Sequence, residues 1–174
     1  MSDIIVGYWS KTGYTQRYAE WIATRLSADL VAAPTLHQLL AYRVVIVGGG
    51  VYQSGIHGVD AVKKNIALFG SKQLILFATG ASPAGNIEVE TILHANCHPN
   101  EQNRIHFFYF RGGFDFQRLH RSDKLLMTLY RAKLQAKASL TPDESDLLRA
   151  MNHPVDFTDI KMIDPLIELV EGEK

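Results

Sequence analysis

The stretch Val6-Gly7-Tyr8-Trp9-Ser10-Lys11-Thr12-Gly13-Tyr14-Thr15 joins an apolar run to an amphipathic one. The apolar run, from Ile4 to Tyr8, predicts a buried strand. After the stretch, apolar residues recur at helical spacing and polar residues take the opposite side, which predicts a helix that begins at once. The apolar positions of this helix are Tyr18, Ala19, Ile22, Ala23 and Leu26. The chain therefore passes from a strand through a short hydroxyl-rich loop into a helix.

This loop has the features of a phosphate cradle. A helix N-terminus has unpaired N–H groups and the positive end of the helix dipole. Ser10, Thr12 and Thr15 add hydroxyl donors, and Gly13 lets the backbone close around a small anion. Neutral donors suit a phosphate monoester that is held and not transferred. The alternative is an ordinary turn between a strand and a helix, with a capping threonine.

Other phosphate loops are excluded by residue type. The chain has no Gly-x-x-x-x-Gly-Lys-Ser/Thr run, which the nucleotide P-loop requires, and no Gly-x-Gly-x-x-Gly run, which marks dinucleotide sites. A cysteine that cleaves phosphate would have to lie in the loop, but the single cysteine is Cys97. The loop is therefore of a different kind.

Length and composition predict a single domain over residues 1–174. The formal net charge of +0 gives no bulk electrostatic reason to expect a nucleic-acid partner. One cysteine cannot form an internal disulfide, which fits a reducing compartment. We see no leader sequence and no apolar run long enough to span a bilayer, so we expect a cytoplasmic protein.

Further along the chain, runs typical of strands alternate with runs typical of helices. Strands are predicted at Asp29 to Ala33, Arg43 to Val47, Gln73 to Ala78 and Ile105 to Phe110. Helices are predicted at Leu36 to Ala41, Ile56 to Phe69, Ile87 to Cys97 and Ile160 to Val170. Thr158 or Asp159 should cap the last helix, and Pro165 should kink it or mark its true start. This alternation predicts an α/β fold with a parallel sheet covered on both faces.

The spacing Ser10-x-Thr12-Gly13-x-Thr15 resembles the FMN phosphate loop of the flavodoxins, in which Tyr-Trp-Ser also occurs just ahead, as at Tyr8-Trp9-Ser10. The resemblance implies a three-layer α/β/α sandwich with five parallel strands in the order 2-1-3-4-5, and FMN as the cofactor. It implies that the phosphate is held by Ser10, Thr12, Gly13 and Thr15, with backbone N–H groups of Lys11 and Tyr14 contributing. No metal site is expected.

Two further loops follow strands whose carboxyl ends should lie beside the phosphate loop. The glycine-rich loop from Gly49 to His57 offers Val51, Tyr52 and Gly55 to one side of the flavin ring, with Tyr52 as a stacking face. The alternative for Tyr52 is that it covers the sheet end. The loop from Thr79 to Pro83 offers Thr79, Gly80 and Ala81 to the other side of the ring. No side chain stands out as a general acid or base, so no catalytic residue is named.

Roughly fifty residues, at about 112–158, separate the fifth strand from the last helix, which far exceeds a usual connection. Within this insert, Leu119 to Lys137 is basic and has an apolar stripe. The stripe consists of Leu119, Leu126, Leu129, Tyr130 and Leu134. Such a helix can lie on an anionic membrane, hold an acidic substrate or dock a partner. The alternative is a helix packed on its own domain with its basic side chains extended to solvent. Thr141-Pro142-Asp143-Glu144 then predicts a capped short helix to about Ala150.

This layout resembles the menaquinone-dependent protoporphyrinogen oxidases, which carry a long insert after strand 5 with an Asp-(Lys/Arg)-(Phe/Leu)-(Leu/Met) helix. Asp123-Lys124-Leu125-Leu126-Met127 matches that pattern. The resemblance implies an FMN-dependent oxidoreductase with its own substrate, for example a quinone or a porphyrinogen. A simple electron carrier that docks on a redox partner is the alternative within the same class.

A hypothesis from another class is a binding or regulatory module that kept the fold and lost the flavin. Its mark would be a damaged phosphate loop, and this loop is intact. Contact with the inner face of a membrane through Leu119 to Lys137 is a further hypothesis. The sequence leaves open whether the protein is a monomer or a dimer.

Overall fold

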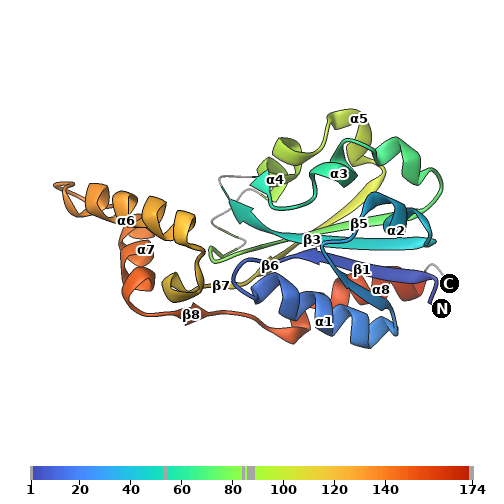
Figure 1. The fold of residues 1–174 in the computed structure, drawn as a ribbon, viewed down its shortest axis with the longest axis horizontal. Helices are drawn as coiled ribbons and strands as arrows, with labels where there is room; N and C mark the ends of the chain where they lie inside the picture. Colours follow the sequence, from blue (N-terminus) through green and yellow to red (C-terminus); the bar gives the residue numbers. More distant parts are fainter. Residues whose placement is uncertain (1, 53–54, 84, 86–88, 173–174) are drawn as a thin grey trace.

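The computed structural model describes residues 2–52, 55–83, 85 and 89–172. A parallel sheet has helices on both faces, and a helical arm extends from one end of it (Figure 1). The long strands are β1 (Ile4–Trp9), β2 (Asp29–Ala32), β3 (Val44–Tyr52), β5 (Gln73–Gly80) and β6 (Ile105–Arg111). Their spatial order is β2-β1-β3-β5-β6. Since β5 and β6 are the fourth and fifth long strands, the predicted α/β fold and the order 2-1-3-4-5 are confirmed.

Two hydrophobic clusters hold the sheet between its helices. On one face, α1 (Tyr14–Leu26) and α8 (Asp164–Gly172) pack on residues such as Ile46 and Phe77. On the other face, helical residues such as Phe69 and Ile92 pack on the opposite sides of the same strands. The central strands are buried on both sides, which explains their continuous apolar sequence.

The strand predicted at Arg43 to Val47 is longer than expected. It continues through the glycines to Tyr52 and pairs antiparallel with β4 (Gly55–Ile56). A Cβ atom on Gly49 would collide with the backbone carbonyl oxygen of His57, so the close pass of these two segments requires glycine there. Of the predicted loop, Gln53 and Ser54 lie outside the described residues.

The single helix predicted at Ile56 to Phe69 is wrong. Ile56 belongs to β4, and the rest divides into α3 (Asp60–Lys63) and a 3₁₀ turn η1 (Ile66–Phe69). Between them, Asn65 has a φ of −129°, which leaves the helical range. The predicted apolar face is nevertheless buried, because burial of a side chain does not require an unbroken helix. Its members are Val59, Val62, Ile66 and Phe69.

Most of the remaining helical segments follow the prediction: α2 (Leu36–Leu40), α4 (Val89–Asn96), the 3₁₀ turn η4 (Ile160–Ile163) and α8. The short helix α5 (Pro99–Gln102) was not predicted. Ile87, the predicted first residue of α4, lies outside the described residues. The carboxylate of Asp159 accepts a hydrogen bond from the N–H of Lys161 and so caps η4. Pro165 is the second residue of α8, so it marks the true start of that helix.

The arm is the predicted insert, and the two chain segments that connect it to the sheet domain lie side by side. β7 (Gly113–Phe114) pairs antiparallel with β8 (Val155–Asp156), and we call this pair the β7–β8 ribbon. Between the two strands lie η3 (Phe116–Arg118), α6 (Arg121–Gln135) and α7 (Pro142–Asn152). The predicted capping box of α7, formed by Thr141 and Glu144, is present.

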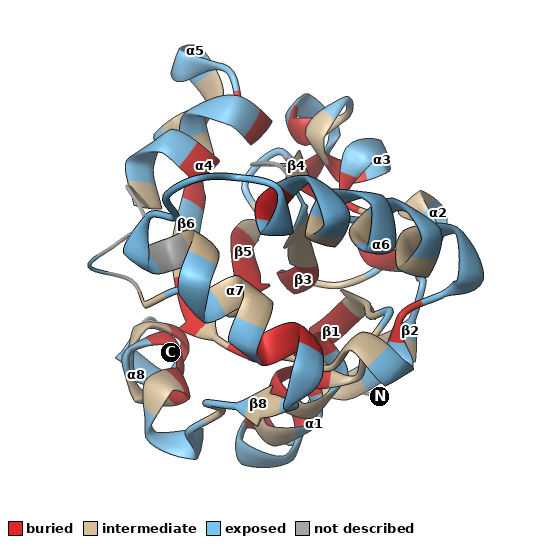
Figure 2. Ribbon diagram, turned by 90° about the vertical axis from the view of Figure 1, so that its left-hand side faces the viewer, coloured by how far each residue is buried: buried red, intermediate tan, exposed pale blue. Residues whose placement is uncertain are grey.

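The apolar stripe of the insert is divided between the interior and the surface. Leu119 and Leu134 are buried, but Leu126, Leu129 and Tyr130 are exposed. Figure 2, which views the arm end-on, accordingly shows exposed residues along much of α6. Packing on its own domain therefore accounts for only part of the stripe. No helix in the described part of the chain is long and apolar enough to cross a membrane.

Candidate cofactor site

The loop after β1 forms an open, donor-rich turn. The hydroxyl oxygen of Ser10 accepts a hydrogen bond of 3.0 Å from the N–H of Gly13. Gly13 has a φ of +93°, in the left-handed region, and is the N-cap of α1. Because glycine has no side chain, the first N–H groups of α1 receive no side-chain cap from the described residues. These N–H groups and the helix dipole favour an anion at this position.

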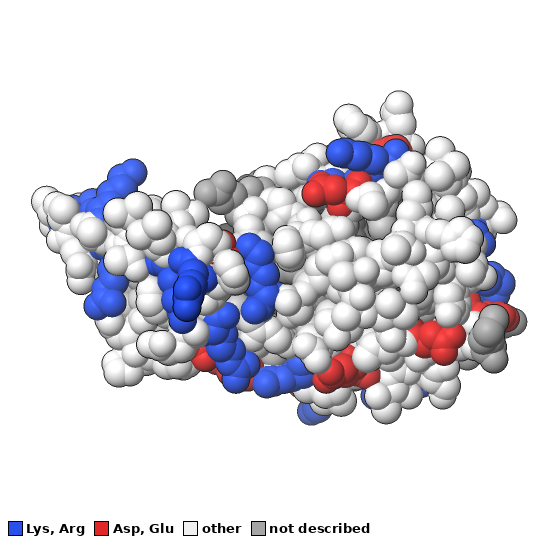
Figure 3. Space-filling view, viewed as in Figure 1, with Lys and Arg blue, Asp and Glu red and all other residues white. Residues whose placement is uncertain are grey.

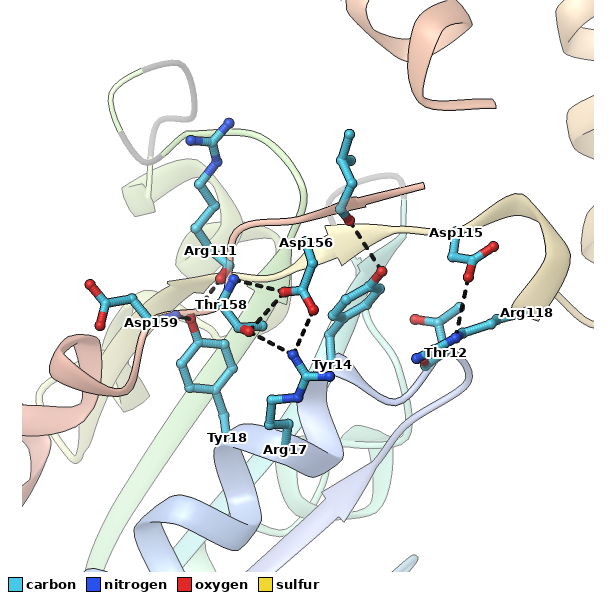
Figure 4. Close-up of polar contacts among 11 residues, drawn as sticks. Thr12, Tyr14, Arg17, Tyr18, Arg111, Asp115, Arg118, Asp156, Thr158 and Asp159 are labelled. Atoms are coloured by element: carbon cyan, nitrogen blue, oxygen red, sulfur yellow. Dashed lines mark hydrogen bonds and ion pairs between the residues drawn. The ribbon is translucent and has the colours of Figure 1, made fainter. Parts of the chain in front are cut away.

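Arg118 approaches this loop from the insert. Its Nη1 atom lies 3.4 Å from the carbonyl oxygen of Thr12, and its Nε atom lies 3.2 Å from the carboxylate of Asp115 (Figure 4). The same Nη1 atom lies 3.6 Å from the place where a Cβ of Gly13 would be. Arg118 thus adds a positive charge beside an otherwise open loop. The sequence analysis did not assign Arg118 to the site, although this residue directly precedes the basic segment from Leu119 to Lys137.

Lys11 turns away from the loop and toward the insert. Its ammonium group pairs with the carboxylate of Asp123 at 2.9 Å and lies 4.6 Å from the centroid of the Tyr52 ring. Burial first, and then the charge of Asp123, raise the pKa of the Tyr52 hydroxyl, so this group is neutral at pH 7. A flavin that stacks on Tyr52 would use the ring face opposite Lys11.

Thr15 connects two of the predicted loops. Its buried hydroxyl lies 2.6 Å from the hydroxyl of Thr79, near the carboxyl end of β5. Because this hydroxyl is bound to Thr79, the group of Thr15 that remains for an anion at the loop is its backbone N–H. Tyr14 behaves similarly, because its hydroxyl donates to the carbonyl oxygen of Val155 at 3.1 Å (Figure 4). Both residues anchor the loop to neighbouring segments.

The three predicted loops meet at one cavity of about 220 Å³, which we call the ring cavity. The predicted residues that line it are Thr12, Val51, Tyr52, Thr79, Gly80 and Ala81. Gly55 does not line it, because this residue pairs with Tyr52 in the turn between β3 and β4. These residues come from the carboxyl ends of β1, β3 and β5, where a parallel sheet holds its ligands.

The insert forms the opposite wall of the ring cavity, which the sequence did not reveal. This wall consists of Gly113, Phe114, Leu119, Asp123, Leu126 and Met127. Three of its members fall in Asp123-Lys124-Leu125-Leu126-Met127, the pattern that the sequence did single out. Apolar side chains face the backbone-rich loops across the cavity, which suits a flat ring with polar edges.

A second cavity, of about 470 Å³, adjoins the ring cavity through Leu119 and Asp123. Lys11 and Arg118 also line it, so it carries positive charge beside the phosphate loop. Together the two cavities fall within the ~300–1,000 Å³ of small-molecule sites. The donor set and the shape fit FMN, with its phosphate at the loop and its ring in the ring cavity. The described residues contain no cluster of three or more His, Cys, Asp or Glu that could hold a metal ion.

Comparison with known families gives one match that covers most of the chain. A family model described as a flavodoxin domain matches residues 5–140. The match ends within the arm, so it includes the phosphate loop, the sheet and α6. A search of curated proteins found no match.

Solved structures with a similar fold include three that represent different kinds of protein. A WrbA-like flavodoxin from Agrobacterium tumefaciens is 21% identical, with 73% of this chain and 90% of that chain covered, at a TM-score of 0.46. A flavodoxin from the domain Archaea is 15% identical, with coverages of 86% and 99% and a TM-score of 0.38. Rubredoxin oxygen:oxidoreductase from Desulfovibrio gigas is 13% identical, with coverages of 97% and 37% and a TM-score of 0.41. These likenesses carry no argument about activity, and the comparisons do not show the expected similarity to protoporphyrinogen oxidases.

Proposed function

Because this chain belongs to the flavodoxin domain family, we propose that it is a redox protein with FMN as its cofactor. Family membership supports a flavin-binding redox protein in general. The choice of FMN rests on the donor-rich loop at the start of α1 and on Arg118 beside it. The observation that carries the proposal is the meeting of three loops from β1, β3 and β5 around the ring cavity.

Each part of the site has a separate task in this proposal. The N–H groups at the start of α1, with the hydroxyls of Ser10 and Thr12, hold the phosphate. Tyr52 packs on one face of the ring, and backbone groups of residues 79–81 contact its polar edge. The flavin supplies the electron chemistry when bound, while the protein orients it and sets its potential.

The insert favours an enzyme with its own substrate over a simple electron carrier. Phe114, Leu119 and Met127 cover the ring cavity on the side that a carrier would leave open to its redox partner. The reaction class is therefore an FMN-dependent oxidoreduction. Quinones and porphyrinogens are the substrates to assay first, and the carrier is supported instead if neither reacts while a protein partner is reduced.

A binding or regulatory module without flavin is the alternative from another class. The donor-rich loop and the converging walls of the ring cavity argue against it, because a module without flavin has no need of either. The two readings differ in a single observable, the flavin content of the protein.

The test is the visible absorption spectrum of the purified protein, before and after addition of FMN and a mild reductant. We expect a protein-bound flavin band that survives gel filtration and bleaches on reduction. Riboflavin, which lacks the phosphate, should bind more weakly than FMN because the loop then has no anion to hold. A protein that stays colourless at micromolar FMN would contradict the proposal and support the alternative.

A further inference from the structure

A third cavity, of about 310 Å³, adjoins the ring cavity, and most of its lining residues have no part in the proposed FMN site. We call it the side cavity. It shares Ala81 and Phe114 with the ring cavity, and α7 and the β7–β8 ribbon supply most of its remaining walls. Its apolar lining includes Phe114, Leu147, Ala150, Val155 and Phe157. These walls suit the apolar body of a small molecule.

The principal charge in the side cavity is the guanidinium of Arg111, which is held firmly. Its Nε atom donates to the carbonyl oxygen of Ala81 at 3.1 Å. Its Cζ atom lies 3.6 Å from the centroid of the Phe157 ring, so one face of the guanidinium is covered. Arg111 is partly buried at the last position of β6. The side chain is therefore positioned before any ligand arrives.

The terminal nitrogens of Arg111 remain available to an anion. Within the described residues, the structure pairs this guanidinium with no carboxylate. The nearby carboxylate of Asp156 is already occupied by Arg17 at 2.6 Å and by Thr158 (Figure 4). Figure 4 also shows that the guanidinium of Arg111 points away from that pair. A planar guanidinium with a free edge binds a carboxylate in two parallel hydrogen bonds.

Arg149 adds a second positive charge at the rim of the side cavity. Its Nη1 atom lies 3.7 Å from the carboxylate of Asp146, and both side chains are more than 70% exposed. Such an exposed and long ion pair contributes little, so Arg149 can turn toward a ligand at low cost. The carboxylate of Asp146 also lines the side cavity, but it is largely exposed at the rim beside Arg149. A ligand would therefore meet apolar walls, the fixed cation of Arg111 and, at the rim, the exposed pair of Arg149 and Asp146.

We propose that the side cavity binds a small organic anion, with its carboxylate on Arg111 and an aromatic or aliphatic body between Phe114 and α7. An inorganic anion would leave the apolar walls unfilled, and a neutral molecule would leave the guanidinium edge without an acceptor. A cation would be repelled by Arg111. The shared wall at Ala81 and Phe114 places the ligand beside the flavin ring, so a role as substrate rests on the proposed function, whereas binding itself does not.

The test is calorimetric titration of the full-length, flavin-free protein with 2-naphthoate and with 2-naphthamide, its uncharged analogue. We expect 2-naphthoate to bind about tenfold more tightly than 2-naphthamide. This ratio corresponds to the lower end of the free energy that a hydrogen bond to a charged group contributes. Arg111→Gln should remove this difference and leave 2-naphthamide unaffected. Arg121→Gln removes the same charge from an exposed site that does not line the cavity, and should change neither affinity.

A second variant tests the walls independently of the charge. Leu147→Trp, on α7, should fill the side cavity and weaken both probes about tenfold or more. Equal affinity for the two probes, no binding of either, or full retention of 2-naphthoate binding in Arg111→Gln would overturn the proposal. FMN binding is measured separately on each variant. Binding of 2-naphthoate without binding of FMN would support the anion site in the side cavity and contradict the proposed function. Binding of FMN without binding of 2-naphthoate would contradict only the anion site.

Discussion

At the level of single residues, the positive charge beside the proposed phosphate loop comes from a residue far away in the chain. The loop itself contributes neutral hydroxyls and N–H groups, and Lys11 is engaged with Asp123. Arg118 supplies the positive charge beside the loop at Thr12. A phosphate at this position would therefore contact a cation that belongs to the insert.

Replacement of Arg118 by glutamine should weaken FMN binding about tenfold, because a hydrogen bond to a charged group contributes ~1.5 kcal/mol or more. Riboflavin has no phosphate, so its affinity should not change. Fluorescence titration with both flavins measures the effect, and Arg121→Gln is the matched control of charge on the same arm. Equal losses for FMN and riboflavin would show that Arg118 acts on the fold and not on the phosphate.

The second prediction at this level concerns the proposed stacking of Tyr52 on the flavin ring. Removal of its ring in Tyr52→Ala should weaken flavin binding by ~0.5–1.5 kcal/mol beyond the lost burial and should shift the flavin potential. Tyr52→Phe keeps the ring and should preserve both. Titration with FMN and redox titration of the bound flavin are the measurements. An unchanged affinity and potential in Tyr52→Ala would exclude the stacking role.

At the scale of elements, the β7–β8 ribbon is held to α1 by polar contacts. The carboxylate of Asp156 receives hydrogen bonds from Thr158 and Arg17 (Figure 4). Burial raises the pKa of Asp156, but the hydrogen bonds from Thr158 and the charge of Arg17 outweigh it and hold this pKa below its ordinary value. The ionised carboxylate is therefore the form that stabilises the ribbon.

This lowered pKa predicts how the stability of the ribbon depends on pH. Since the folded-state pKa of Asp156 lies below the unfolded value of about 4, the contribution is complete above pH 4 and is lost as the pH falls through the folded-state pKa. Asp156→Asn should lower the free energy of unfolding at pH 7 by about 1 kcal/mol or less, because the pair is partly exposed. It should also reduce the loss of stability that occurs as the pH falls below about 4. Urea unfolding at several pH values tests this, with Asp146→Asn as the control; an unaltered acid dependence would contradict it.

Helix α6 presents an apolar face to solvent within a basic segment. Leu125, Leu126 and Leu129 are 65%, 57% and 63% exposed. Figure 3 shows lysine and arginine side chains gathered over the arm and near its junction with the sheet. Exposed leucines beside basic residues are suited to the surface of an anionic membrane.

We therefore propose that α6 contacts anionic lipid, and expect the protein to co-sediment with vesicles rich in anionic lipid but not with neutral vesicles. The double substitution of Leu125 and Leu129 by serine should abolish co-sedimentation, and high salt should weaken it. Neither leucine lines the ring cavity, so FMN binding should be retained. Absence of co-sedimentation with anionic vesicles would remove the membrane proposal.

At the scale of the whole molecule, the arm and the sheet are separate in their packing. Neither hydrophobic cluster of the sheet includes a residue from the insert. The arm begins at the carboxyl end of β6, however, and parallel strands bring all their carboxyl ends to one edge. An insert at this point must therefore lie beside the loops that form the ring cavity.

This separation predicts the effect of removing the arm. Replacement of residues 115–154 by Asn-Gly joins the two strands of the ribbon with a favoured hairpin turn. We expect the shortened protein to fold cooperatively, because the clusters of the sheet remain complete. FMN binding should weaken, because one wall of the ring cavity and Arg118 are lost. Thermal unfolding and FMN titration measure the two effects, and unchanged FMN affinity would show that the arm is not part of the site.

The sequence was enough to predict the alternation of strands and helices, the hydroxyl-rich loop after the first strand and the caps at Thr141 and Asp159. These features depend on neighbours within a few residues, through strand and helix periodicity, turn chemistry and capping. The strand order, by contrast, was implied by the resemblance to flavodoxins and not by any local pattern. The meeting of the three loops was also predictable, since the ends of parallel strands share an edge. Local patterns were insufficient at Ile56 to Phe69. The apolar spacing was kept there, but Ile56 pairs with β3 and the helical path is interrupted at Asn65.

How the insert contacts the site depends on packing between distant segments, and the sequence did not show it. The contacts of Lys11 with Asp123, of Arg118 with Thr12 and of Thr15 with Thr79 join segments that are 112, 106 and 64 residues apart. The path of a long insert depends on where its apolar residues find partners, and no local pattern encodes that path. The side cavity at Arg111 arises in the same way, because its walls come from the loop after β5, the end of β6, the ribbon and α7, and exist only once these have packed together.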